Sequence, residues 1–239
     1  MLALRLGQSI GAGNNPVTFT NKFSLSFDGV DDYADISNAA SAVDISKGCF
    51  SAWVKLDTTS INAPIFKCYA NANNQITIIY LHSSNQIKFM YKGGGVNTQV
   101  QGATSIEADG NFHHIALSWK VSANTLKAYI DGVQFLSTAI NFGTFVGTPS
   151  VFHIGHNALS GSDFWKGNID EFAVFNQSKT DADIANIYNS GTPTDLSGES
   201  GLIGYWRMED GTGIKLADQS GQGNTGTLIN GTTFSTDVP

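Results

Sequence analysis

The segment NFHHIALSWKVSANTLKAYIDGVQF, residues 111–135, decides the fold class, because apolar and polar residues alternate through it in two successive runs. In a β-strand, every second side chain lies on the same face. The residues that share the inward face are Ile115, Leu117, Trp119, Val121, Leu126, Ala128 and Ile130. The dipeptide Asp131-Gly132 suits a type I′ turn, which needs positive φ at both central residues. The segment therefore predicts antiparallel strands and a tight β-hairpin.

The same alternation recurs on both sides of this segment and predicts further strands. The predicted strand segments are residues 23–27, 49–56, 75–92 with a turn at Ser83-Ser84-Asn85, 150–156, 168–176 and 202–210. Charged residues make up only 14% of the chain, and Gly accounts for 26 of its 239 residues. This composition favours strands and turns over long helices.

One segment, KTDADIANIYNSG at residues 179–191, predicts a helix. Thr180 and Asp183 have the spacing of a capping box, and Gly191 is placed to end the helix. Its apolar stripe consists of Ile184, Ile187 and Tyr188. About a dozen short strands with a single capped helix predict an all-β sandwich of two sheets.

The overall composition excludes some classes of function. The formal net charge is −7 and no run of Lys or Arg occurs, so we expect no nucleic-acid partner. No apolar run approaches the roughly 20 residues that span a bilayer, and residues 1–16 lack the apolar core of a secretory signal, so we expect neither membrane insertion nor export by that route. Cys49 and Cys68 could pair, but two cysteines make no disulfide framework, and we expect free, partly buried thiols.

The stretch SGQGNTG, residues 220–226, matches the G-x-G-x-x-G spacing of a dinucleotide-binding loop. Such a loop must open a helix, so that the pyrophosphate lies at the helix N-terminus. The residues that follow, TLINGTTF, are typical of a strand, and only 13 residues follow Gly226. We therefore interpret the glycines as turn residues, with side-chain oxygens of Asp218 and Asn224 supporting the turn.

Several motifs, taken in order, make this sequence similar to the laminin-G-like, concanavalin A-like jelly-roll domains. They are LSFDGVDDY (residues 25–33), FSAWVKL (50–56), NFHHIALSW (111–119), LKAYIDG (126–132) and FWKGNIDEFAVFNQSKTDADIANIY (164–188). The resemblance covers nearly the whole chain from Phe23. It implies a two-sheet antiparallel jelly-roll sandwich with one short helix.

The C-terminal segment GYWRMEDGTGIKLADQSGQGNTGTLING, residues 204–231, also resembles this family. In most members such a segment precedes the FDG-x-x-DY strand, whereas here it comes last. It is either part of a circularly permuted sandwich or the remnant of a second repeat, and we favour the first because too little chain follows for a second domain. We expect an N-terminal arm at residues 1–22, the jelly roll at 23–191, and a segment at 192–239 that completes the same sandwich.

The order of leader, single jelly roll and tail resembles virion structural proteins of marine tailed phages. This resemblance implies a non-enzymatic capsid decoration, fibre or tail component that is assembled in the host cytoplasm. Its partners would be other virion proteins or further copies of itself, with host surface glycans as a ligand. The alternative is a carbohydrate-binding, lectin-like module of a bacterial surface or secreted protein, which would be extracellular.

The resemblance also implies a calcium ion, a hard cation that takes 6 to 8 oxygen ligands. The ligand set that it suggests is Asp218 and Asn224 with Asp170 or Glu171, and a second set is Asp28, Asp31 and Asp32. The other reading of each set is that its side chains cap turns or are solvated. Strand alternation places Asp170 and Glu171 on opposite faces, which is wrong for a glycosidase pair. We therefore expect no catalytic residues.

Four aromatic residues, Trp53, Tyr69, Tyr91 and Trp165, have positions that could expose a ring for stacking on a sugar, although packing within strands is the alternative for each. Trp119 and Trp206 are expected in the core. The histidines are expected to be structural or surface residues, because His153 and His156 differ in face on a strand, as do His113 and His114.

Overall fold

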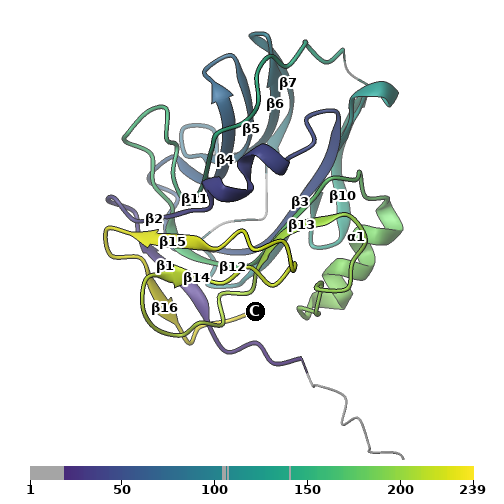
Figure 1. Ribbon diagram of the computed structural model, residues 1–239. Helices are drawn as coiled ribbons and strands as arrows, with labels where there is room; N and C mark the ends of the chain where they lie inside the picture. Colours follow the sequence, from purple (N-terminus) through teal and green to yellow (C-terminus); the bar gives the residue numbers. More distant parts are fainter. Residues whose placement is uncertain (1–18, 104–105, 107, 140) are drawn as a thin grey trace, which may run out of the picture.

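The computed structural model describes residues 19–239 apart from 104–105, 107 and 140 (Figure 1). Within these residues the chain forms two eight-stranded sheets that pack face to face, with all strand pairs antiparallel. A single α-helix, α1 (Asp181–Tyr188), accompanies three short 3-10 turns. The predicted all-β sandwich is confirmed.

The first sheet is built around the long strands β3 and β12. In spatial order it contains β10 (Val133–Ala139), β9 (Thr125–Ile130), β8 (His113–Lys120), β3 (Lys47–Leu56), β12 (Lys166–Phe175), β1 (Ser24–Asp28) and β16 (Thr233–Ser235). An eighth strand, β13 (Leu202–Trp206), shares one edge of β12 with β1.

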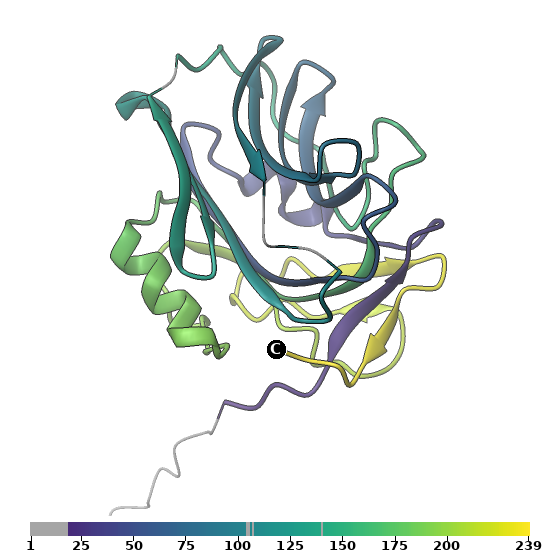
Figure 2. The ribbon, with the colours of Figure 1, turned by 180° about the vertical axis from the view of Figure 1, so that it is seen from behind.

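The second sheet is a meander extended by strands from both ends of the chain. In spatial order it contains β14 (Lys215–Leu216), β15 (Gly226–Ile229), β2 (Tyr33–Asp35), β11 (Val151–Ile154), β4 (Ala63–Asn71), β5 (Asn74–Leu81), β6 (Gln86–Gly93) and β7 (Val96–Ala103). Figures 1 and 2 show this sheet on the side of the molecule away from α1.

Aromatic rings fill the space between the sheets. The Phe50 ring lies 4.3 Å from that of Phe66 and 5.1 Å from that of Trp119, measured between centroids. Phe152 and Phe172 meet edge to face at 5.8 Å, a favoured arrangement of two rings. Trp119 and Trp206 are fully buried, so their expected core positions are confirmed.

The predicted hairpin is confirmed, since Ile130 pairs with Val133 across a turn in which Asp131 and Gly132 have φ of 49° and 73°. The helix also begins as predicted, with Thr180 accepting a hydrogen bond from the Asp183 amide and the Asp183 side chain accepting one from the Thr180 amide. Its end differs from the prediction. Asn189, in a left-handed conformation, caps the helix two residues before Gly191.

The C-terminal segment contributes strands to both sheets. β13 pairs with β12, β15 pairs with β2, and β16 pairs with β1. The SGQGNTG loop leads into strand β15 and not into a helix, which agrees with its interpretation as a turn. The domain boundaries at residues 22 and 191 stay a prediction, and most of the expected arm, residues 1–18, lies outside the described residues.

The last residues of the expected arm lie against the domain. Asn21 donates a hydrogen bond to Asp170, and the backbone amides of Lys22 and Phe23 both donate to Glu209. Arg207 donates to the Thr20 carbonyl at 2.6 Å. The chain therefore enters the sandwich from a fixed point beside β12 and β13.

Both cysteines are free and fully buried, which is deeper than expected. Burial raises the pKa of each thiol, so neither is a reactive thiolate at neutral pH. Among the described residues, none of the helices has the length and apolar character needed to cross a bilayer.

Candidate functional site

The outer face of the first sheet is covered by α1 and the segment after it (Figure 2). A second apolar cluster lies there, consisting of Cys49, Ala116, Tyr129, Ala173, Phe175, Ile184, Ile187, Leu196, Leu202 and Tyr205. Because this face is used to pack the helix, most of it is closed to a ligand.

Trp53 belongs to this covered face, so the expectation that its ring is exposed is wrong. Strand alternation does direct it outward, but Tyr188 of α1 stacks on it at 5.7 Å and leaves only 4% exposed. It forms part of the wall of a hollow of about 280 Å³, together with Phe112 and Pro239. The sequence pattern indicates the face correctly, and it predicts the helix, but it does not show that the helix packs over Trp53.

Two other predicted sugar-stacking residues are also buried. The ring of Tyr91 faces the core, where its hydroxyl donates to the Ile45 carbonyl at 2.9 Å, and Trp165 is 0% exposed. Both expectations of an exposed ring are therefore wrong, because the alternation along the chain directs these two side chains into the space between the sheets. Tyr69 is half-buried on the outer side of β4, where stacking stays a prediction.

The first predicted calcium set takes part in hydrogen bonds of the protein. Both oxygens of the Asp218 carboxylate accept backbone hydrogen bonds, from Tyr205 and Ser220 on Oδ1 and from Asn224 on Oδ2. The Asn224 side chain donates to the Ile203 carbonyl at 2.8 Å. These bonds close the loop after β14, and calcium binding there stays a prediction.

Asp170 and Glu171 are used within the protein and do not face an open site. Glu171 has a φ of 48° and lies at a break in the register between β12 and β3, which is a β-bulge. The bulge places both carboxylates on the outer side of the first sheet, so the expectation of opposite faces is wrong. Asp170 accepts from Asn21, and Glu171 accepts from the Tyr205 hydroxyl and from Arg207.

Burial dominates the chemistry of these two carboxyl groups. It raises the pKa of Asp170 well above its usual value and that of Glu171 to about 7, with hydrogen bonds from Tyr205 and Arg207 acting in the opposite direction. Asp170 is 0% and Glu171 3% exposed. Neither carboxyl therefore faces a space in which a glycosidic bond could bind.

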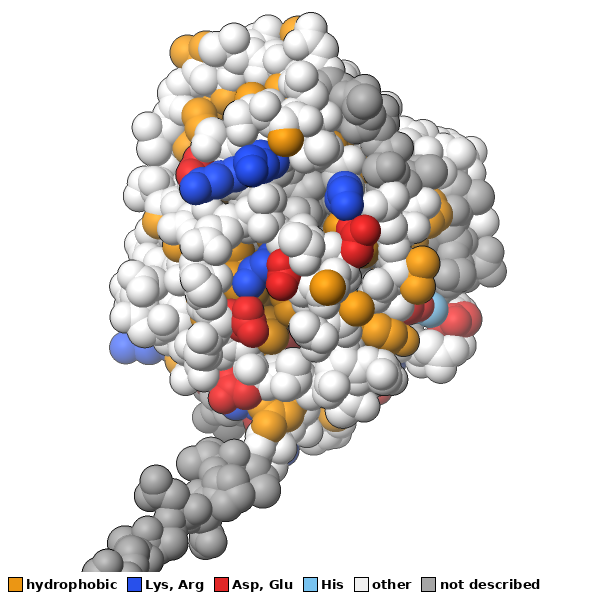
Figure 3. All heavy atoms as spheres, turned by 90° about the vertical axis from the view of Figure 1, so that its right-hand side faces the viewer, with side chains coloured by type: hydrophobic (Ala, Val, Ile, Leu, Met, Phe, Trp, Pro, Cys, Tyr) orange, Lys and Arg blue, Asp and Glu red, His pale blue; other side chains and the backbone are white. Residues whose placement is uncertain are grey.

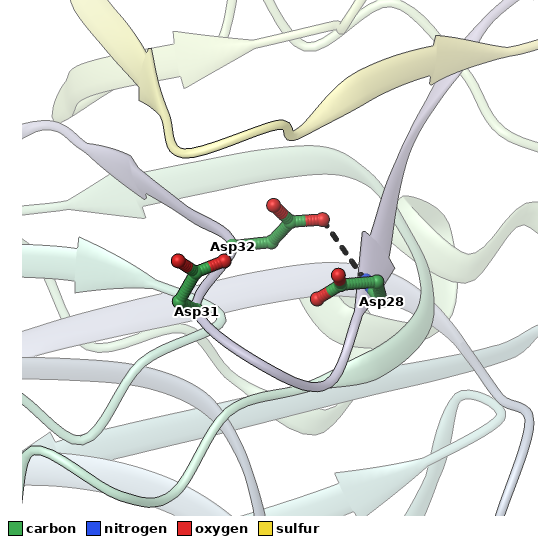
Figure 4. A group of neighbouring side chains, drawn as sticks. All are labelled: Asp28, Asp31 and Asp32. Atoms are coloured by element: carbon green, nitrogen blue, oxygen red, sulfur yellow. Dashed lines mark hydrogen bonds between the residues drawn. The ribbon is translucent and has the colours of Figure 1, made fainter.

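The second predicted set does come together (Figure 4). One carboxylate oxygen from each of Asp28, Asp31 and Asp32 lies within 4.8 Å of the others, on the turn between β1 and β2. Asp32 also accepts from the Asp28 amide at 3.0 Å, and burial raises the pKa of Asp32. Three oxygens of this kind suit calcium, so within the described residues this turn fits a cation better than the other set.

A hollow of about 340 Å³ lies beside the start of α1. Three lysines lie in its wall, and two of them are paired with carboxylates, Lys127 with Asp181 at 2.7 Å and Lys179 with Glu199 at 2.9 Å. The third is Lys120. Figure 3 shows this side of the molecule, where basic and acidic side chains adjoin one another among neutral polar atoms. The two pairings offset most of the positive charge of the hollow.

The outer face of the second sheet has a different character, and we call it the polar face. The strand register places one row of side chains across it, from β2 to β7. The row is Asp35, His153, Lys67, Thr77, Met90 and Gln99. A parallel row contains Val151, Tyr69, Gln75, Lys92 and Asn97.

Stacked rings form one end of the polar face. Tyr33 lies 4.5 Å from His153, His153 lies 5.4 Å from His156, and His156 stacks on Phe164 at 4.4 Å, all between ring centroids. The expectation that His153 and His156 lie on different faces is wrong. Strand β11 ends at Ile154, and Gly155 with a φ of 83° turns the chain so that both rings lie on the same side.

Lysines form the middle of the polar face. Burial, together with the neighbouring charges of Lys88 and Lys92, lowers the pKa of Lys67 to about 8, against the opposite effect of Asp163. Lys67 donates to the Asn157 side chain at 2.6 Å. Three cations thus lie near one another on a chain whose net charge is −7. Lys88 and Lys92 lie on the same strand, β6, and the sequence alone could not show that Lys67 of β4 lies beside them.

The sequence also matches a family model described as "Concanavalin A-like lectin/glucanases superfamily" over residues 28–185. A search of curated proteins found no match.

Several solved structures share the fold. A Bacteroides ovatus protein, provisionally described as carbohydrate-binding, superposes with a TM-score of 0.65 at 15% identity, over 91% of this chain and 60% of its own length. The CBM40 of Ruminococcus gnavus IT-sialidase has a TM-score of 0.60 at 12% identity, over 70% of this chain and 97% of its own. A SAP-like pentraxin from Limulus polyphemus has a TM-score of 0.53 at 14% identity, with coverages of 70% and 82%. The chain thus spans less than two thirds of the first of these structures.

Proposed function

The chain belongs to the concanavalin A-like lectin/glucanases superfamily, and from this premise we propose that it is a carbohydrate-binding, lectin-like module whose glycan binds on the polar face. The observation that carries the proposal is the contrast between the two outer faces of the sandwich. The first is packed under α1, whereas the second has polar side chains along its strands. On this second face Thr77, Gln75, Lys67 and Met90 are buried, Tyr69, Lys88 and Lys92 are half-buried, and Asn97 and Gln99 are exposed. Two solved proteins with this fold are described as carbohydrate binders.

The chemistry of the polar face suits a sugar. Half-buried Tyr69 and Tyr33 offer rings on which the CH face of a pyranose can stack. Neighbouring side-chain amides and lysine ammonium groups supply hydrogen-bond donors for hydroxyl groups. Lys67, Lys88 and Lys92 favour a glycan that bears carboxylate or sulfate groups, because such a ligand offsets their mutual repulsion.

We assign this module a binding role without catalysis. The assignment is supported by the burial of Asp170 and Glu171 and by their hydrogen bonds to protein donors.

Binding to a panel of neutral, carboxylated and sulfated polysaccharides tests the proposal. We expect saturable binding to an acidic glycan, weakened at least tenfold by Tyr69→Ala and by the double change of Lys88 and Lys92 to Gln. Lys127→Gln is the matched control, since Lys127 is a surface lysine on the other sheet. Binding that Lys127→Gln reduces as much as the polar-face variants would count against this location.

A virion structural role is the second candidate, and it rests on the arrangement of the whole sequence. It is supported by the anchoring of Thr20 and Asn21, because a segment that precedes them leaves the domain from a fixed point. Deleting residues 1–18 and measuring the molar mass by light scattering tests the predicted attachment or self-association. An unchanged mass and unchanged binding to particles would contradict it, whatever the outcome of the glycan panel.

A further inference from the structure

His153 and His156 are brought together in a way that their spacing in the sequence does not predict. Their Nδ1 atoms lie 3.2 Å apart, and their rings are nearly parallel, with 16° between the planes. We propose that these two nitrogens bind one divalent transition cation, of the zinc, nickel or copper class, on the polar face. The proposal does not rest on glycan binding.

The separation of the two nitrogens is that of two ligands on one metal. Zinc binds imidazole nitrogen at about 2.0–2.1 Å, so two nitrogens at a tetrahedral angle lie roughly 3.3–3.4 Å apart. The 3.2 Å between the Nδ1 atoms of His153 and His156 is within about 0.2 Å of this value. In the structure this distance is that of a hydrogen bond between the two nitrogens, so the ion would replace the proton that they share.

A carboxylate lies on the far side of one imidazole. The Nε2 atom of His153 is 3.8 Å from Oδ1 of Asp35, its neighbour in the register of β11 and β2. Metal-binding histidines commonly direct their second nitrogen to a carboxylate, which fixes the tautomer and makes the ligating nitrogen more basic. The Oδ1 atom of Asp35 also accepts from the Ser37 amide at 2.9 Å, so Asp35 acts on His153 through its charge, as a positioning residue.

The surroundings hold the two rings in place. His153 stacks on Tyr33, and His156 stacks on Phe164 with only 3° between the ring planes. The backbone around His156 is fixed by its bridge to Phe164 and by hydrogen bonds between Asn157 and Asp163. Rings that are already oriented lose little freedom on binding an ion, which favours affinity.

Charges of both signs lie near the pair. Asp35 lies close to His153, and Asp163 acts on His156 in the direction opposite to Lys67, whose ammonium group is engaged by Asn157. Among the described residues, no His, Cys, Asp or Glu joins the pair to make a three-ligand group. The remaining coordination positions are therefore left to water or to an oxygen of a bound ligand, as in an open metal site.

The test is a titration of the full chain, free of any affinity tag, with Zn²⁺, Ni²⁺ and Co²⁺ by calorimetry. We expect one saturable site that His153→Gln and His156→Gln each weaken more than tenfold. His82→Gln is the matched control, because His82 is exposed on a turn away from the pair, and it should leave binding unchanged. Asp31→Asn removes a carboxylate from the turn between β1 and β2, and it should also leave metal binding by the histidine pair unchanged.

Two further measurements keep the proposal testable if a histidine variant fails to fold. Asp35→Asn retains both ligands and should weaken binding about tenfold, the low end of the effect of such a carboxylate. In the unaltered chain, Co²⁺ should broaden the NMR signals of the His153 and His156 rings before those of His82. The absence of saturable binding, or broadening of all histidines alike, would show that the pair is only a hydrogen-bonded contact and would overturn the proposal.

Discussion

Replacing Glu171 by Gln removes a buried carboxyl group that links β12 and β13 to the end of the N-terminal arm. Glu171 accepts from the Tyr205 hydroxyl and from Arg207, and Arg207 in turn binds the Thr20 carbonyl. Burial raises the pKa of Glu171 from 4.5 to about 7. The charged form is therefore disfavoured in the folded protein relative to the unfolded chain.

The sign of the pH effect follows from this shift. Below pH 4.5 the group is neutral in both states, and between 4.5 and 7 the folded state binds more protons, so the unfolding free energy falls as the pH rises. Above pH 7 the decrease in the unfolding free energy is complete. A shift of this size corresponds to at most about 3 kcal/mol, at 1.36 kcal/mol per pKa unit. The Gln variant lacks this loss, so its stability relative to the unaltered protein should increase from pH 4.5 to 7.

The assay is urea unfolding of both proteins at several pH values from 4.5 to 8. Taking the difference between them cancels the pH-dependent contributions that the two proteins share. Glu199→Gln is the matched control, because Glu199 is a surface glutamate paired with Lys179. A difference curve for Glu171→Gln that is flat from pH 4.5 to 8, like that of the control, would refute the reasoning.

Three other predictions concern the acidic turn formed by Asp28, Asp31 and Asp32, the glycine at position 155, and the N-terminal cap of α1. Millimolar calcium should raise the melting temperature through the acidic turn, and Asp31→Asn should abolish the rise; a melt indifferent to calcium and chelator would contradict this site. Gly155→Ala should cost about 2–4 kcal/mol in urea unfolding, because its φ is 83° and a Cβ would lie 2.8 Å from the Phe27 ring. Gly161→Ala meets no atom within 4 Å and should cost about 1 kcal/mol, so equal losses would argue against the clash. Thr180→Ala should cost about 1 kcal/mol by removing the cap, and an unchanged unfolding midpoint would contradict that role.

Local patterns in the sequence were sufficient to predict the helix and many of the strands, but β2, β4 and β7 were not among the predicted segments. The alternation through Ile115 and Leu117 and the turn at Asp131-Gly132 depend on neighbouring residues alone, and the structure has them as predicted. The capping box at Thr180 is equally local. The sandwich follows because each strand has one apolar face that must be buried.

The site could not be predicted to the same degree, because its geometry depends on long-range packing and on breaks in alternation. The bulge at Glu171 and the turn at Gly155 each shift the side-chain phase, which overturned the faces expected for Asp170 with Glu171 and for His153 with His156. Trp53 has the outward phase that was expected, yet α1 covers it. The lysine group on the polar face comes from β4 and β6, and only the register of these strands with β5 brings Lys67 near Lys88 and Lys92.

The central claim is that the polar face binds a glycan. The most direct measurement is a titration of the isotopically labelled full chain with the acidic polysaccharide that binds best in the panel, followed by NMR. The account predicts that signals of Tyr69, Lys88 and Lys92 shift saturably while those of Trp53 and α1 stay in place. Shifts confined to the first sheet, or no binding by any polysaccharide in the panel, would contradict it.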